Sequence, residues 1–344
     1  DPVVEPPPYS RRINVPADPR QSSWIMISGV SDNPAVVVLG GGTGLAMLLS
    51  GLKHYTTDLT AVVTVADDGG SSGRLRREMG IIPPGDIRNC LVALAEDESL
   101  MGELFQYRFE EGDGSLSGHS FGNLFLAALT RVTGDFEEAV RLSSKILKTR
   151  GRVLPASLDT VWLKAELDDG SMVEGQSAIA GSNRCCRQIW LEPRDTRPTD
   201  AVLEAIAGAD IIVAGPGSLF TSIIPNLLIA DIVQAIAAAG CPRVFICNVM
   251  TQPGETLGFT AADHLEALIA HTQAGIFDTI LVNTEDPPPP LVEFYSAKGS
   301  APVVVDSDRL ESSGIQVLAA NVASGGNYFR HDSGKLAAAI MSLL

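Results

Sequence analysis

The sequence predicts a doubly wound α/β fold, with a mainly parallel sheet flanked by helices and an antiparallel hairpin at one edge. Short, continuous apolar runs alternate with segments of helical apolar spacing, and an Asp-Gly pair separates two further strand-like segments. Apolar, β-branched runs suit strands that are covered on both faces. Their alternation with helices indicates a parallel sheet with crossover connections.

The individual elements follow from these patterns. Apolar runs that end near Gly, Asn or Asp predict strands over residues 35–39, 59–66, 210–214, 243–247 and 279–282. Helical apolar spacing predicts helices over residues 45–53, 86–95, 121–130, 136–147, 227–239 and 261–270. Asp169 and Gly170 join segments 161–167 and 171–174 into the predicted hairpin. Four consecutive prolines at 287–290 predict a stiff surface loop.

Composition limits the organisation and the partners. Residues 1–34 are rich in proline and predict an extended arm or linker, whereas residues 35–344 predict one single domain. The chain has 344 residues and a net charge of -16, so nucleic acid and anionic lipid are not expected as general partners. Five cysteines without a C-x-x-C pair indicate a reducing, cytoplasmic environment. Because the chain begins at Asp1, an upstream membrane anchor stays an open alternative.

Two glycine loops each follow a predicted strand and open a helix. Glycines allow a tight turn, and backbone amides at a helix N-terminus attract phosphate. The dinucleotide fingerprint G-x-G-x-x-G fails at its third glycine, which weakens an NAD-dependent dehydrogenase as an interpretation. Asn248, after the next strand, would extend the rim of the second loop. The ligand-binding candidates in the two loops are Gly41, Gly42, Thr43, Gly44, Gly215, Gly217, Ser218 and Ser222.

A polar loop after the second predicted strand supplies further candidates. Its two acids, Asp67 and Asp68, can accept hydrogen bonds from ribose hydroxyls or hold a divalent ion such as Mg²⁺. Amides, hydroxyls and a guanidinium in the same loop suit phosphate oxygens, and these belong to Gly70, Ser71, Ser72 and Arg74.

Two helix starts contribute the remaining polar candidates. Asp86 and Ser120 fit helix N-caps, so part of each motif is structural. His119, beside Ser120 and Asn123, is as consistent with facing a ligand as with packing. We assign no catalytic residue, because we expect no G-x-S-x-G nucleophile elbow, and neither a metal-binding helix of the H-E-x-x-H type nor a P-loop occurs.

These segments closely resemble the YvcK family of bacterial proteins, also called gluconeogenesis factors and related to the CofD 2-phospho-L-lactate transferases. The resemblance covers residues 35–344 in order. It is carried by Gly-Gly-Gly-Thr-Gly-Leu from Gly40, Val-Ala-Asp-Asp-Gly-Gly-Ser-Ser-Gly-Arg-Leu-Arg from Val65, Pro-Pro-Gly-Asp-Ile-Arg-Asn from Pro83, Gly-His-Ser-Phe-Gly-Asn from Gly118, Gly-Pro-Gly-Ser-Leu-Phe-Thr-Ser from Gly215 and Cys-Asn-Val-Met-Thr-Gln-Pro-Gly-Glu-Thr from Cys247.

The resemblance implies a Rossmann-like domain that binds UDP-sugars, notably UDP-N-acetylglucosamine. It implies a regulator of cell shape and wall synthesis during gluconeogenic growth, without an established reaction. By motif, Thr43 would contact the nucleotide, Asp67 and Asp68 would line its phosphates, and Asn89, Asn123 and the 215–222 loop would complete the crevice. Arg330, in Phe-Arg-His-Asp, would contact the sugar nucleotide. Phe259 stands where some relatives have tyrosine, so stacking is retained but a hydroxyl is lost.

The transferase branch is the alternative implied by the same resemblance. In that branch the crevice holds a guanine nucleotide and Mg²⁺, and the Asp67-Asp68 pair would bind the metal. The Gly-Gly-Ser-Ser-Gly-Arg continuation favours the YvcK branch. We also expect a homo-oligomer and a protein partner in cell-wall precursor metabolism.

Overall fold

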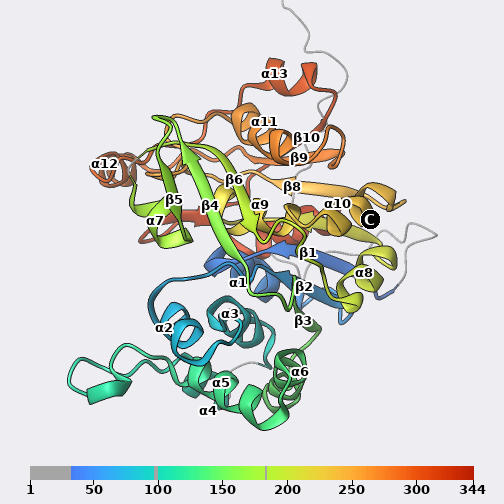
Figure 1. Cartoon of the computed structure of the whole chain (residues 1–344). Helices are drawn as coiled ribbons and strands as arrows, with labels where there is room; N and C mark the ends of the chain where they lie inside the picture. The colour runs from blue at the N-terminus through green and yellow to red at the C-terminus, as the bar shows by residue number, and fades with distance from the viewer. Residues whose placement is uncertain (1–31, 97–99, 183) are drawn as a thin grey trace, which may run out of the picture.

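The computed structural model describes residues 32–96, 100–182 and 184–344 (Figure 1). The arm predicted over residues 1–34 therefore lies outside the described residues up to residue 31.

The core of the described chain is a seven-stranded parallel sheet, which confirms the predicted fold class. The strand order is β10-β9-β8-β7-β1-β2-β3. The strands are β1 (Val36–Gly40), β2 (Leu59–Val63), β3 (Arg152–Pro155), β7 (Ile211–Ala214), β8 (Arg243–Ile246), β9 (Thr279–Asn283) and β10 (Gln316–Ala320). Every residue of β1, β2 and β7 is buried, as continuous apolar runs predict.

The strand order reverses direction beside β1. From β1 the chain proceeds outward through β2 to β3, and it then returns to β7 on the other side of β1 and proceeds outward again to β10. Right-handed crossovers that run in opposite directions place their helices on opposite faces of the sheet. The point between β1 and β7 is thus the topological switch point, where ligands bind in folds of this kind.

Helices cover the sheet and gather at both of its ends (Figure 1). Helix α1 packs between α3 and α14, while α8 packs beside α10. The helices are α1 (Gly42–Leu52), α2 (Gly70–Met79), α3 (Gly85–Leu94), α4 (Leu100–Gln106), α5 (Phe121–Thr133), α6 (Phe136–Leu147), α7 (Gln176–Gly181), α8 (Asp200–Ala207), α9 (Ile224–Leu227), α10 (Ala230–Ala238), α11 (Ala261–His271), α12 (Pro289–Ser296), α13 (Ser307–Ser312) and α14 (Ser333–Met341), with short turns η2 (Gly114–Leu116) and η3 (Leu219–Ile223).

The predicted hairpin forms, but it does not lie at the edge of the large sheet. Strands β4 (Trp162–Leu167) and β5 (Met172–Glu174) pair antiparallel, and β6 (Cys186–Glu192) adds a third strand to this separate sheet. In Figure 1 these strands cross in front of the large sheet. Residues along β4 alternate between buried and half-buried, so one face of the small sheet packs on the core and the other is more accessible. A third pair, β11 (Ala323–Gly325) and β12 (Phe329–His331), forms a short antiparallel ribbon.

Three further expectations about local structure were wrong. The polar loop after β2 turns into α2 at Gly70, because Leu75 and other buried residues of that segment pack inward. The helix predicted over 227–239 breaks, since Ile229 takes an extended backbone and buries its side chain. The proline run is not all loop, because α12 begins at Pro289, a position where proline is well tolerated.

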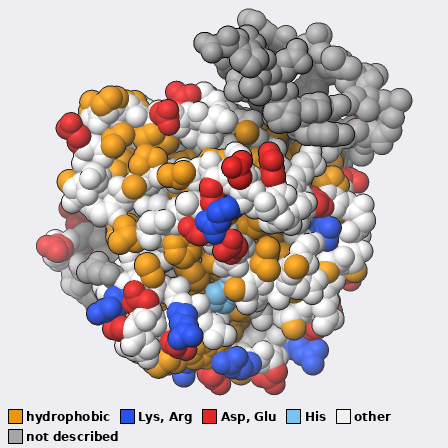
Figure 2. Space-filling view, turned by 90° about the horizontal axis from the view of Figure 1, so that it is seen from above, with side chains coloured by type: hydrophobic (Ala, Val, Ile, Leu, Met, Phe, Trp, Pro, Cys, Tyr) orange, Lys and Arg blue, Asp and Glu red, His pale blue; other side chains and the backbone are white. Residues whose placement is uncertain are grey.

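The surface mixes charge and apolar groups. Figure 2 shows acidic and basic side chains interspersed with apolar ones over the face seen from above. Within the described residues, no single helix is long and apolar enough to cross a membrane. One bent pair, 219–227 with 230–238, passes that test only when its two helices are taken together.

Candidate functional site

The two predicted glycine loops meet at the switch point. Gly41 to Gly44 follow β1 and open α1, and Gly215 to Ser218 follow β7 and open η3. A Cβ added at Gly44 would lie 2.6 Å from the Pro216 carbonyl oxygen, and one at Gly217 would lie 3.4 Å from the Gly41 oxygen. The loops therefore touch, and Gly44 has no space for a side chain. Thr43, in the first turn of α1, is exposed at this junction.

A buried asparagine holds the two loops together. Asn226 Nδ2 donates to the Gly40 carbonyl at 3.1 Å and to the Ser222 carbonyl at 2.9 Å. Ser222 is itself buried, and its Oγ would lie 3.6 Å from a Cβ at Gly42. Gly215 has a φ of +90°, a backbone conformation that favours glycine. The crevice thus has a rigid floor made from both halves of the sheet.

One buried and one half-buried carboxyl group face the amides at two of the helix starts. Asp86 accepts a hydrogen bond from the Gly42 backbone N–H, and burial together with the nearby Asp67 raises its pKa to about 6. Asp67 accepts from the Gly69 N–H at 2.9 Å and from Ser72, and burial raises its pKa as well. A carboxyl group with a raised pKa takes up a proton readily when another anion approaches.

Asp68 serves a different helix. Its Oδ1 accepts from the Ser177 N–H at 3.0 Å and from Ser177 Oγ at 2.9 Å, at the start of α7. The two neighbouring carboxylates, Asp67 and Asp68, are therefore each bound to separate helix starts. Within the described residues, no group of three or more His, Cys, Asp or Glu side chains is placed to hold a metal ion. Mg²⁺ usually takes only one or two protein carboxylates, so the joint site at Asp67 and Asp68 stays a prediction.

Glu255 was missed by the sequence analysis. It is buried, and it accepts from the Phe220 N–H at 3.2 Å and from Thr221 Oγ1 at 3.0 Å. Burial raises the pKa of this carboxyl group. Glu255 thus occupies amides of η3 that a phosphate could otherwise use, so the second glycine loop is the less available anion site. The only sequence feature that could have indicated a role for Glu255 was its position in the Gln-Pro-Gly-Glu-Thr segment.

A cavity of about 470 Å³ continues from the second loop along the carboxyl ends of β8 and β9. Asn248 lines it and donates from Nδ2 to the Gly217 carbonyl at 2.8 Å, which joins the cavity to the loop. Its walls are mostly apolar, with Glu285 and Asp286 among its polar lining residues; the apolar wall includes Val249, Val282, Pro302, Val303, Val304, Val305 and Phe329. Such walls suit a planar base, and carboxylates accept hydrogen bonds from ribose or base N–H groups.

Arg330 and Phe259 lie in different surroundings. Arg330 follows Phe329, which lines the cavity, and its side chain is exposed. None of the ion pairs found among the described residues involves Arg330. Phe259 instead packs edge-to-face on Phe220 and His264, at 6.2 Å and 5.6 Å between ring centroids, and it does not line the cavity.

The remaining candidates form a polar cluster at the starts of α2 and α5. Ser71 Oγ lies 2.9 Å from His119 Nδ1 and 3.1 Å from Asn123 Nδ2, and all three side chains are buried. Arg74 donates to the Ser117 carbonyl at 2.7 Å beside this cluster. The expectation that no G-x-S-x-G segment occurs was wrong, because residues 69–73, Gly-Gly-Ser-Ser-Gly, have that spacing.

Three other predicted positions have local roles. Ser72 packs against Gly85, where an added Cβ would lie 2.3 Å from its Oγ. Asn89 accepts from Arg88 Nη2 at 2.6 Å, and Ser218 Oγ accepts from Gln252 Nε2 at 2.9 Å. Gly70 is exposed, and a Cβ there would meet nothing within 4 Å.

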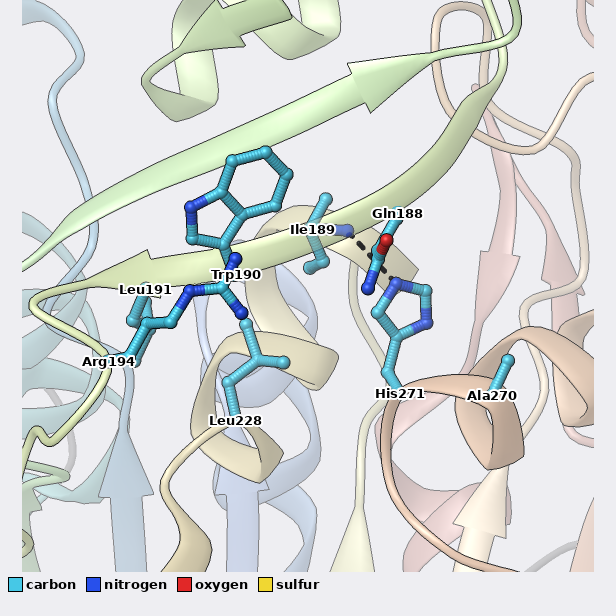
Figure 3. Close-up of a pocket in the computed structure, with 8 residues that line it drawn as sticks. All are labelled: Gln188, Ile189, Trp190, Leu191, Arg194, Leu228, Ala270 and His271. Carbon is cyan, nitrogen blue, oxygen red and sulfur yellow. Dashed lines mark hydrogen bonds between the residues drawn. The ribbon is translucent and has the colours of Figure 1, made fainter.

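A second cavity, of about 210 Å³, lies between β6, the turn after α9 and the end of α11 (Figure 3). His271 accepts there from the Ile189 N–H at 3.0 Å, and Arg194 lies 5.2 Å from the Trp190 ring centroid. The predicted ligand residues are not among those that line it.

Comparison with known proteins gives consistent matches over most of the chain. A family model described as 2-phospho-L-lactate transferase CofD matches residues 36–323. A putative gluconeogenesis factor from Nostoc sp. is 51% identical over 311 residues, which are 90% of this chain and 68% of that protein. The gluconeogenesis factor of Bacillus subtilis is 48% identical over 316 residues, which are 92% of this chain and 99% of that protein.

A solved structure shows the same architecture. The crystal structure of a UPF0052 family member from Bacillus halodurans has a TM-score of 0.87 and 48% identity to this chain. The match covers 90% of this chain and all of that one.

Proposed function

Because this chain belongs to the family of the gluconeogenesis factors, within the wider CofD family, we propose that it binds a nucleotide sugar at the switch point between β1 and β7. The ligand we propose is a UDP-sugar, UDP-N-acetylglucosamine. The observation that carries this proposal is the continuity of the first glycine loop, the second loop and the cavity beside Asn248.

Each part of such a ligand has a chemically suitable surface. The uracil and ribose enter the apolar cavity, where Glu285 and Asp286 accept hydrogen bonds. The diphosphate lies at the N-terminus of α1, whose amides carry partial positive charge, and Arg330 supplies a guanidinium from the neighbouring ribbon. The sugar then extends toward the starts of α2 and α3.

The buried carboxyl group of Asp86 fits this arrangement if binding is coupled to proton uptake. A diphosphate near Gly42 would further disfavour the ionised form of Asp86, whose pKa is already about 6. The net charge added to the crevice is then smaller than the charge of the ligand.

A CofD-like transferase that uses a guanine nucleotide is the second candidate, and the description of the matching family model favours it. A divalent cation in that reaction would neutralise phosphate charge. Here Asp67 and Asp68 are bound to different helix starts, which does not support a joint metal site. The binding proposal is therefore preferred.

Isothermal titration calorimetry with UDP-N-acetylglucosamine tests the proposal against this alternative. We expect one site per chain, weaker binding of UDP, and no requirement for Mg²⁺. GDP that binds more tightly than the UDP-sugar, and only with Mg²⁺, would favour the transferase. Absence of heat and of a thermal shift at millimolar UDP-sugar would contradict nucleotide-sugar binding.

We further propose that the bound state regulates cell shape and wall synthesis during gluconeogenic growth, through a protein partner. Five unpaired cysteines fit a cytoplasmic location for this role.

A further inference from the structure

We propose that Ser71 is a nucleophile activated by His119, and that it accepts a phosphoryl group from a phosphoric ester or anhydride. This is covalent chemistry beyond ligand binding. The proposal stands on the polar cluster of Ser71, His119 and Asn123 at the starts of α2 and α5, to which the binding proposal assigns no named contact.

The hydrogen bonds around Ser71 are compatible with an activated hydroxyl group. Asn123 Nδ2 donates to Ser71 Oγ at 3.1 Å, and in the tautomer that we propose the Ser71 hydroxyl donates to His119 Nδ1 at 2.9 Å. His119 Nδ1 is then an acceptor, and the proton of the neutral ring is on Nε2. Burial and the guanidinium of Arg74 hold the pKa of His119 below its ordinary value, which keeps the imidazole able to accept a proton. This is the arrangement of a hydroxyl nucleophile and its general base.

The backbone around Ser71 resembles that of a nucleophile at a strand-to-helix connection. Ser71 lies in the first turn of the ten-residue helix α2, where the first N–H groups lack acceptors within the helix. These amides can stabilise negative charge that develops on an attacked phosphorus centre. A Cβ at Gly73 would lie 1.8 Å from the Asp68 carbonyl oxygen, so the second glycine of G-x-S-x-G is sterically required. Unlike the usual elbow, Ser71 does not follow its strand directly, since β2 ends at Val63.

Gly70, directly before Ser71, is exposed, and a Cβ added there would meet no atom within 4 Å. Ser71 itself is 4% exposed. In the proposed reaction a substrate would have to approach from the side of Gly70, since His119 and Asn123 contact the hydroxyl group elsewhere.

Two buried polar atoms without partners also point to a ligand here. Asn123 is 2% exposed, and its Oδ1 has no hydrogen-bond partner among the described residues. Arg88 is 8% exposed and its Nε is likewise unpartnered, while its side chain lies against Gly122 at the start of α5. Buried polar groups are nearly always satisfied, so these two favour a polar group that enters the cluster.

The surrounding charges favour a phosphoryl over an acyl group. Arg74 Nη2 donates to the Ser117 carbonyl and Arg108 Nη1 to the Gly118 carbonyl, both at 2.7 Å, on the segment that leads into His119. Each guanidinium retains other N–H groups that can bind phosphoryl oxygens. Positive charge next to the reacting phosphorus stabilises a phosphoryl-transfer transition state.

The proposed step balances without a metal or redox partner. Ser71 Oγ attacks phosphorus and its proton passes to His119 Nδ1. A new O–P bond forms on serine, the bond from phosphorus to the leaving group breaks, and the leaving group departs with the electron pair. His119 then returns the proton to the leaving group or to water.

A fluorophosphonate probe tests the nucleophile directly, because labelling forms the Oγ–P bond and releases fluoride. Peptide mass spectrometry of the full chain should place the adduct on Ser71, and Ser71→Ala should abolish it. Ser333→Ala is the matched control, since Ser333 also begins a helix but lies in α14, and its labelling should equal that of the unchanged protein.

His119→Ala separates activation from folding. We expect labelling to slow by about 100-fold, a usual contribution of a general base, and to be partly restored by added imidazole. His119→Gln, with an unchanged thermal melt, guards against loss of fold. No adduct on Ser71, or equal labelling rates with and without His119, would overturn the proposal. Calorimetry with UDP-N-acetylglucosamine measures the binding function separately, so the two proposals can fail independently.

Discussion

Replacing Asp86 with asparagine should stabilise the fold at neutral pH. Asp86 is buried beside Asp67, and its pKa is raised from 3.8 to about 6. The difference corresponds to about 3 kcal/mol, at about 1.4 kcal/mol for each tenfold change in proton affinity. Because the pKa of Asp86 is raised only in the folded state, the protonated carboxyl group stabilises the folded protein. This stabilisation is fully present below pH 3.8 and is lost as the pH rises through about 6. Asparagine removes that loss and keeps an oxygen for the Gly42 N–H.

Urea unfolding of both proteins measures the effect. At about pH 7.5, Asp86→Asn should raise the free energy of unfolding by about 1 to 3 kcal/mol, the lower values reflecting the lost attraction to Arg88. At about pH 4.5 the gain should fall by more than half. Asp58→Asn, at an exposed position, is the control and should change stability by less than about 0.5 kcal/mol. A gain that is equal at both pH values, or a loss at pH 7.5, would contradict a raised Asp86 pKa in the folded protein.

Three further predictions concern the crevice and its supports. Arg330→Ala should weaken UDP-N-acetylglucosamine binding by about 1 to 3 kcal/mol in calorimetry without lowering the melting temperature, because the side chain is exposed; unchanged affinity would remove Arg330 from the site. Gly44→Ala should lower stability and abolish UDP-sugar binding, because the alanine Cβ would lie 2.6 Å from the Pro216 carbonyl oxygen. Normal affinity of this variant in calorimetry would show that binding does not require contact between the two loops. Burial lowers the pKa of His331 to about 4 in the folded protein. The stability that neutral His331 contributes is therefore present above pH 6.5, and the free energy of unfolding should decrease by up to about 3 kcal/mol as the pH falls toward 4. A His331→Asn variant with the same acid sensitivity in urea unfolding would contradict this pKa shift.

Local patterns were sufficient for five of the seven strands of the sheet and for the loops at its edge, whereas the two outermost strands, β3 and β10, were not predicted. The buried runs of β1, β2 and β7 are apolar throughout, and the glycines that follow β1 and β7 mark the turns that meet at the switch point. Helix α2 was not predictable in this way, because its start is rich in glycine and serine and its helical state depends on buried packing.

Contacts between distant segments account for what the sequence analysis missed at the site. Glu255 reaches Phe220 across 35 residues, and His119 reaches Ser71 across 48 residues, so neither pairing has a local signature. Asp68 was expected beside Asp67 in the crevice, yet its carboxylate binds Ser177, which lies 109 residues further along the chain. Adjacent residues therefore have separate roles that only the folded arrangement reveals.

A crystal structure with UDP-N-acetylglucosamine would show where each part of the ligand binds. We predict density for the diphosphate at the amides of Thr43 and Gly44, for the uracil in the cavity lined by Asn248, and for an Arg330 guanidinium within hydrogen-bond distance of the ligand. Density for the nucleotide in the cavity beside Trp190 and His271, or a crevice left empty at saturating ligand, would contradict this prediction.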